Sequence, residues 1–174
     1  MSFEQANFEN KPTKEDSKEK ILTPRERLLS LEKEGIFVFH GTPEKVEFLE
    51  PHQSYTGKNK EKHGDAAVCA ADTAETAIFR AIINIKNFPK GGSNCFGFNE
   101  DGSLDFGMEK NYFENLSNKK GLVYVLPKSE FKRFEDRGEW RSEKPVMPVE
   151  VVFVTEKDLP KNIQLIDKNF KKIS

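Results

Sequence analysis

The residues of this chain best suited to a chemical role are His40, Gly41 and Thr42, which follow the apolar run IFVF. A histidine at the exit of a strand presents two ring nitrogens to a cleft from a rigid base. The glycine beside it lets a ligand approach the backbone, whose amide and carbonyl groups can pair with a planar carboxamide. The alternative interpretation is structural: a loop carbonyl binds the imidazole, and the glycine only turns the chain.

A second group of candidates lies in the segment GEWRSEKPV. If this segment is a strand, its period of two places Glu139, Arg141 and Glu143 on one face and Trp140 on the other. Such a charged face is either the wall of an anion-bearing site or a solvated surface. Of the two carboxylates, Glu139 is the stronger candidate, because the neighbouring Trp140 should anchor its end of the strand in the core. Glu143 directly precedes the Lys-Pro pair, where the strand should end.

Other common site patterns do not occur in the sequence. It has no Gly-rich phosphate loop, no His pair at metal-binding spacing and no Cys-x-x-Cys motif. Cys69 and Cys95 lie in apolar segments, which favours two buried free thiols and a reducing compartment. A nucleophilic Cys–His pair stays open as an alternative.

Composition narrows the possible functions further. The 28 Lys and Arg residues nearly balance the 29 Asp and Glu residues, giving a formal net charge of −1. This balance argues against a sequence-independent nucleic-acid binder, which needs a basic surplus. No apolar run approaches the roughly 20 residues of a membrane-spanning helix, and the N-terminus lacks a secretory signal. We therefore expect a cytoplasmic protein with no membrane partner.

These candidate residues must be positioned by an ordered domain. Residues 1–20 are charged and poor in apolar side chains, so we expect a flexible arm before a single domain over residues 21–174. A capping box at Thr23 and Glu26 begins a helix that Gly35 ends. A second capping box, over residues 72–75, begins a helix whose apolar positions continue to Ile85.

Strand signals are spread through the chain, with most of them late. We expect strands at residues 36–40, 46–49, 66–71, 95–98, 104–108, 121–126, 131–134, around Trp140, 149–154 and 163–166. Asp101 and Gly102 favour a hairpin turn, and residues 53–65 form a polar, Lys-rich loop. Early helices and late strands predict an α+β fold with a largely antiparallel sheet and a few flanking helices.

Taken together, these motifs resemble the ADP-ribosyltransferase fold. The resemblance consists of a strand ending in His-Gly-Thr, a long loop, a small-residue strand leading into a capped helix, and a late Glu on a sheet strand. The runs VFHGTPEKVEFLEPHQ, AAVCAADTAETAIFRAI and EWRSEKPVMPVEV are also similar to a group of uncharacterised bacterial proteins with that arrangement. The resemblance covers roughly residues 36–154, and it implies a split antiparallel sheet.

The same resemblance implies an activity that uses NAD as substrate. His40 would bind the adenosine-side ribose, and Gly41, next to Thr42, would hold the nicotinamide carboxamide. Glu139, with Glu143 as its rival, would bind the nicotinamide ribose and stabilise the oxocarbenium-like transition state. The ADP-ribose would pass to an acceptor that is a protein, a nucleic acid, a small molecule or water.

The sequence departs from the family pattern at its second strand. The transferases usually have a Tyr or Ser there, whereas this strand reads VCAADT. The resemblance then implies an aromatic platform from elsewhere, with Tyr55, Tyr112 and Phe113 as candidates. The Lys-rich loop would close over the phosphates. This departure keeps a second hypothesis open, a non-catalytic module that binds a nucleotide or a protein on the same fold.

Overall fold

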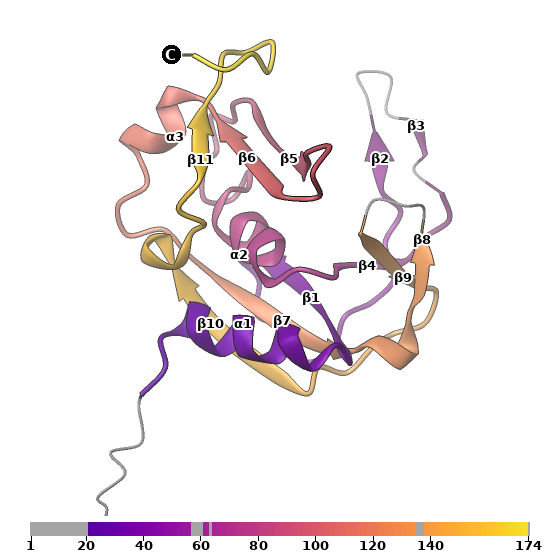
Figure 1. The fold of residues 1–174 in the computed structure, drawn as a ribbon. Coiled ribbons are helices and arrows are strands. Elements are labelled where there is room, and N and C mark those ends of the chain that lie inside the picture. The colour runs from indigo at the N-terminus through magenta and orange to yellow at the C-terminus, as the bar shows by residue number, and fades with distance from the viewer. Residues whose placement is uncertain (1–20, 57–60, 63, 135–137, 174) are drawn as a thin grey trace, which may run out of the picture.

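The chain folds around helix α2 (Ala74–Ile82), of which seven residues are buried. The computed structural model describes residues 21–56, 61–62, 64–134 and 138–173. The expected N-terminal arm, residues 1–20, lies outside this part. Helix α2 lies between a six-stranded sheet and a three-stranded sheet (Figure 1). Its apolar face packs on β1 and β7, while Phe79 contacts Phe106 of the smaller sheet.

Within the described residues, the strands form two larger sheets and one hairpin. The six-stranded sheet has the order β10-β7-β1-β4-β9-β8, with β1 (Phe37–Thr42), β4 (Val68–Ala71), β7 (Lys120–Pro127), β8 (Lys132–Phe134), β9 (Glu139–Ser142) and β10 (Glu150–Thr155). The three-stranded sheet has the order β11-β6-β5, with β5 (Asn94–Phe98), β6 (Leu104–Met108) and β11 (Ile163–Leu165). The hairpin consists of β2 (Tyr55–Thr56) and β3 (Glu61–Lys62).

The described residues form two further α-helices and two 3₁₀ turns. They are α1 (Pro24–Glu34), α3 (Lys110–Glu114) and the 3₁₀ turns η1 (Lys128–Glu130) and η2 (Glu156–Asp158). Within the described residues every strand pair is antiparallel except β11 with β6. The expected α+β class with a largely antiparallel sheet is therefore confirmed. No helix in the described part of the chain is long and apolar enough to cross a membrane.

Two glycines let α2 approach the large sheet closely. A Cβ on Gly41 of β1 would overlap the carbonyl oxygen of Ala77 and lie 2.8 Å from the Ala81 nitrogen. A Cβ on Gly121 of β7 would overlap the carbonyl oxygen of Ala81. The close packing of α2 on β1 thus explains why position 41 is a glycine, whether or not a ligand binds there.

The two predicted helix starts have different outcomes. The Thr23–Glu26 capping box is present, and Gly35 ends α1 in the left-handed conformation with φ of 72°. The box predicted over residues 72–75 is wrong. Thr73 is the N-cap of α2 and makes no side-chain cap. Instead, Glu32 of α1 accepts a hydrogen bond from the Ala74 amide at 2.7 Å.

Three further expectations need correction. Residues 46–49 do not form a strand; Leu49 makes one isolated bridge to Val146. Helix α2 ends at Ile82, and Ile85 is exposed because the chain turns away there. The segment 53–65 carries the β2–β3 hairpin and is not a plain loop, although residues 57–60 and 63 lie outside the described part.

Strand β1 is longer than expected, and this changes the setting of His40. The strand continues through Thr42, so His40 lies within it and not at its exit. On one side β1 pairs with β7 along its whole length. On the other side it pairs with β4 only at Phe39 and Ala71. The two strands therefore separate beyond Phe39, and this separation opens the sheet beside His40.

Candidate functional site

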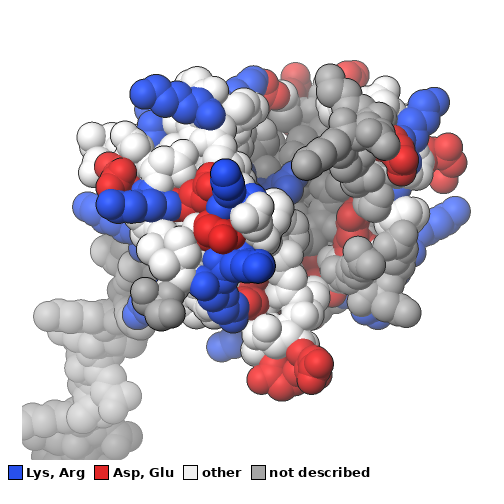
Figure 2. All heavy atoms as spheres, turned by 90° about the horizontal axis from the view of Figure 1, so that it is seen from above, with Lys and Arg blue, Asp and Glu red and all other residues white. Residues whose placement is uncertain are grey.

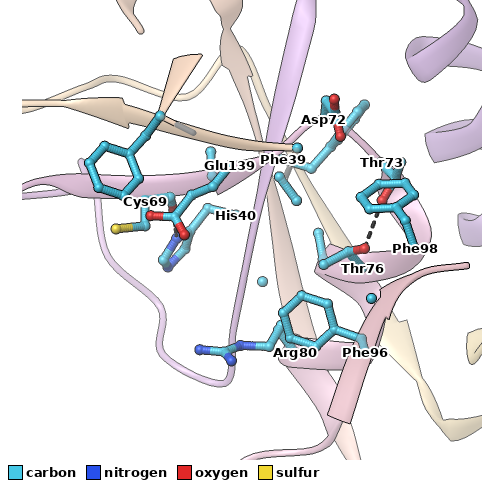
Figure 3. A pocket seen from close by; sticks show the side chains of 17 residues that line it. Phe39, His40, Cys69, Asp72, Thr73, Thr76, Arg80, Phe96, Phe98 and Glu139 are labelled. Carbon is cyan, nitrogen blue, oxygen red and sulfur yellow. Dashed lines mark hydrogen bonds between the residues drawn. The ribbon is translucent and has the colours of Figure 1, made fainter. Parts of the chain in front are cut away.

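A cavity of about 690 Å³ lies where β1 and β4 separate. Its size falls in the range of about 300–1,000 Å³ that small-molecule sites occupy. Figure 3 shows the side chains that surround it. It is lined by Phe39, His40, Gly41, Cys69, Ala70, Ala71, Asp72, Thr73, Thr76, Ala77, Arg80, Phe96, Gly97, Phe98, Phe134, Gly138 and Glu139.

His40 has a defined protonation state at the cavity. Its Nδ1 donates a hydrogen bond to the carbonyl oxygen of Cys69 at 2.7 Å. A carbonyl only accepts, so the neutral ring carries its hydrogen on Nδ1 and a lone pair on Nε2. Burial lowers the pKa of His40 below its usual 6.5; the hydrogen bond to Cys69 opposes this shift, and the charges of Arg80 and His52 add to it. At neutral pH the imidazole is therefore an uncharged acceptor at Nε2.

Glu139 comes from β9 and meets His40 in the same cavity. Its carboxylate extends toward the Cys69 thiol, and both residues line the cavity together with His40 (Figure 3). The Oε1 of Glu139 accepts a hydrogen bond from Arg141 Nε at 2.6 Å, two residues along the strand. The side chain of Glu139 is 30% exposed, whereas that of Arg141 is 9% exposed. The strand thus presents a paired carboxylate to a partly enclosed space.

Cys69 lies beside these groups, and its thiol is not activated. Burial raises the pKa of Cys69, and the negative charge of Glu139 raises it further. His40 contacts the carbonyl of this cysteine by Nδ1 and does not accept its thiol proton there. Because a nucleophilic cysteine needs a lowered pKa, this geometry does not support the Cys–His alternative. The expectation that both cysteines are buried is also wrong, since both are partly exposed.

The opposite wall of the cavity is aromatic and belongs to the smaller sheet. Phe96 and Phe98 are two residues apart on β5 and therefore lie on the same face; their side chains are 41% and 48% exposed. The Arg80 guanidinium of α2 lies over the Phe96 ring, 5.6 Å from its centroid. Phe98 lies close to the turn before β9, where a Cβ on Gly138 would be 3.1 Å from its ring. The Phe rings can stack on a flat ring of a ligand, and the Arg80 guanidinium can bind an anionic group.

The sequence did not indicate this aromatic wall as part of a site. Its one visible signal was the spacing of two between Phe96 and Phe98 in a predicted strand. The proposed platform residues lie elsewhere. Tyr55 is 57% exposed on β2, Phe113 is 40% exposed, and Tyr112 packs against Phe88; none of these three lines the cavity.

The remaining predicted site residues divide between two cavities. Gly41 lines the main cavity with His40. Thr42 lines a second cavity of about 590 Å³, which shares His40 and Cys69 with the first. Glu143 is exposed and follows the last residue of β9, so it does not share the Glu139 face within the strand. The structure therefore brings His40, Gly41 and Glu139 together and leaves Thr42 and Glu143 apart.

The charged residues of the described part form no metal site, and on the face shown in Figure 2 they form no continuous basic surface. No group of three His, Cys, Asp or Glu residues suited to a metal ion occurs among the described residues. On the face in Figure 2, Lys and Arg residues are interspersed with Asp and Glu residues over the described part. This mixture fits the near-zero net charge of the sequence.

Comparison of this chain with protein-family models, with curated proteins and with solved structures found no match. The interpretation of the cavity therefore depends on the chemistry of the residues that line it.

Proposed function

We propose that this protein binds NAD in the main cavity and cleaves the bond between nicotinamide and ribose, passing ADP-ribose to an acceptor. One observation carries this proposal. His40 of β1 and Glu139 of β9 line one cavity, at the point where β1 and β4 separate. These are the two side chains to which the resemblance assigns the ribose contact and the catalytic carboxylate.

The chemistry suits a carboxylate in a partly enclosed cavity. When the C1′–N bond breaks, its electron pair leaves with the nicotinamide, and positive charge develops on the ribose ring. The fixed carboxylate of Glu139 stabilises this charge, because the cavity replaces much of the screening water. The acceptor then adds its lone pair to C1′ and loses a proton, for which Glu139 is a suitable base.

The other walls fit the remaining parts of NAD. The Nε2 lone pair of His40 is placed to accept a hydrogen bond from a ribose hydroxyl. The rings of Phe96 and Phe98 offer a stacking surface for a nicotinamide or adenine ring. Arg80 supplies a cation for the diphosphate at the same wall. Tyr55 does not line the cavity and is not needed for these contacts.

A second function is favoured by two specific observations. One oxygen of Glu139 already accepts from Arg141, and β4 contributes no aromatic side chain to the cavity. Both fit a non-catalytic module that binds a nucleotide without cleaving it. The two functions share the cavity and differ in what Glu139 does there.

Two measurements separate these functions. NAD is titrated into the protein by calorimetry, and the same samples are then assayed for free nicotinamide by chromatography. Binding with nicotinamide release supports the transferase, and ADP-ribose serves as the control ligand that binds without a cleavable bond. Binding without release supports the module, whereas the absence of both binding and release rejects the two functions together.

A further inference from the structure

Arg141 contacts two residues that line the cavity, Glu139 and Phe134. Its Nε donates to Glu139 Oε1 at 2.6 Å. Its Cζ lies 3.4 Å from the centroid of the Phe134 ring, which belongs to β8. Arg141 itself is not among the residues that line the cavity, and its side chain is 9% exposed.

The guanidinium of Arg141 is enclosed from a third side by the chain that follows β3. A Cβ on Gly64 would overlap Arg141 Nη1 and lie 3.3 Å from Cζ. Gln53 holds this segment, because its Nε2 donates to the Gly64 carbonyl at 2.9 Å. The glycine at position 64, with φ of 69°, therefore leaves room for the guanidinium against the backbone.

We propose that Arg141 is a positioning residue that holds the Glu139 carboxylate and the Phe134 ring in place at the cavity wall. This inference rests on the proposed function where it concerns turnover. A guanidinium is planar, so it can stack on Phe134 and donate in its plane to Glu139 at the same time. A lysine ammonium carries the same charge but lacks this fixed geometry.

The register of β9 explains why this arrangement is possible. Residues two apart in a strand project from the same face, so Glu139 and Arg141 lie side by side. Strand β8 pairs with β9 through Phe134 and Glu139, which brings the aromatic ring to the same place. Arg141 thus reaches both groups without entering the ligand space. Its removal should disturb the reaction more than it disturbs NAD binding.

The first experiment measures nicotinamide release and NAD affinity in Arg141→Gln, with Arg141→Lys as the variant that keeps the charge. A misplaced catalytic group costs about 10²-fold in rate, so we expect such a loss in kcat for Arg141→Gln with a Kd for NAD within about threefold of wild type. In a Glu139→Gln background, Arg141→Gln should change kcat by less than about threefold. Arg141→Lys should lose at least about tenfold and remain folded.

Two outcomes of this cycle overturn the proposal. One is full turnover in a folded Arg141→Gln protein. The other is an equal loss of kcat from Arg141→Gln in the wild-type and Glu139→Gln backgrounds, because the proposal assigns the loss of turnover to a displaced Glu139 carboxylate, which the second background lacks. Circular dichroism of each variant separates a lost fold from a lost rate.

The second experiment does not depend on turnover and uses Cys69 as a probe. Cys95→Ser leaves Cys69 as the one thiol of the chain. Among the described residues, the charges of Glu139 and Arg141 act on this thiol, as do its burial and the Ser54 hydroxyl. Glu139→Gln should speed alkylation of Cys69 at least about threefold at pH 8, because a neighbouring negative charge disfavours the thiolate.

The alkylation rates decide the positioning role directly. If Arg141 holds the carboxylate against Cys69, Glu139→Gln changes the rate by less than about twofold in the Arg141→Gln background. An equal change in both backgrounds shows that Glu139 keeps its place without Arg141 and overturns the proposal. If the wild-type protein releases no nicotinamide, the proposed function fails, whereas this second cycle still decides the role of Arg141.

Discussion

His40 and Cys69 are joined across the opening between β1 and β4 by a hydrogen bond of 2.7 Å, from the imidazole Nδ1 to the Cys69 carbonyl oxygen. The His40 side chain thus replaces a backbone hydrogen bond between β1 and β4 at a point where the two strands no longer pair. The bond satisfies a backbone carbonyl that would otherwise face the cavity. It also fixes the ring so that Nε2 is the nitrogen available to a ligand.

Replacing His40 should weaken NAD binding. We expect His40→Ala to cost about 1–3 kcal/mol of binding free energy, the usual loss when a polar partner is left unsatisfied. His52→Ala is the matched control, because His52 lines the second cavity and not the main one. Calorimetry of both variants checks this, and an unchanged Kd in folded His40→Ala contradicts the assignment.

The pH dependence of NAD binding gives a separate test of His40. Burial lowers the pKa of His40 below its usual 6.5, so the ring is neutral above that pH. The Nε2 lone pair accepts only in the neutral form, so protonation at lower pH competes with the ligand. We expect a constant affinity from pH 6.5 to 8 and an affinity that falls only as the pH approaches the lowered pKa of His40, which lies below 6.5. In His40→Gln the affinity for NAD should depend less on pH in this range. If the pH dependence is unchanged in that variant, another group takes up the proton.

Local signals in the sequence predicted much of the fold. The Thr23–Glu26 capping box and the terminating Gly35 involve neighbours in the chain, and both occur in the structure. The start of α2 is different, because its cap comes from Glu32, in another helix. A contact between elements that are distant in the chain leaves no local pattern, which is why the predicted box over residues 72–75 failed.

The candidate site shows the same division. His40 and Glu139 stood out by residue type and by their place in strands, and the structure brings both to one cavity. Phe96 and Phe98 did not stand out, because their role depends on how the smaller sheet packs across α2. The importance of Gly41 for packing was also hidden, since it arises from the distance between β1 and α2.

Gly41→Ala should destabilise the fold whether or not a ligand is present. The added Cβ would overlap the Ala77 carbonyl, which belongs to helix backbone and cannot rotate away. Overpacking of this kind costs about 1–3 kcal/mol of unfolding free energy. Gly97→Ala is the matched control on β5, because its Cβ would meet no atom within 4 Å. Urea unfolding checks both, and equal stabilities of the two variants would contradict this packing role.

The aromatic wall should contribute to NAD affinity. We expect Phe96→Ala to weaken binding by about 1–3 kcal/mol, the range found when a ring that stacks on a base is removed. Phe153→Ala is the control, because Phe153 is 52% exposed on β10 and does not line the cavity. Calorimetry at one pH compares the two variants. Equal affinities would remove Phe96 from the binding site.

Glu139 should be the carboxylate that drives turnover. In Glu139→Gln the amide oxygen can still accept from Arg141, so the size and this contact are kept while the charge is lost. We expect the Kd for NAD to stay within about threefold and nicotinamide release to fall by about 10²-fold or more, as for a lost electrostatic contact in the transition state.

Glu143→Gln is the matched control for this prediction. Strand β9 ends at Ser142, and Glu143 is exposed beyond it, so its carboxylate is neither held by the sheet nor part of the cavity lining. Its replacement should change turnover by less than about tenfold, as for a group outside the reacting site. Initial rates of nicotinamide release, measured at saturating NAD, rank the two variants. The reverse ranking would move the site to Glu143, and full activity in both would refute the mechanism, because no carboxylate of this segment would then stabilise the developing charge.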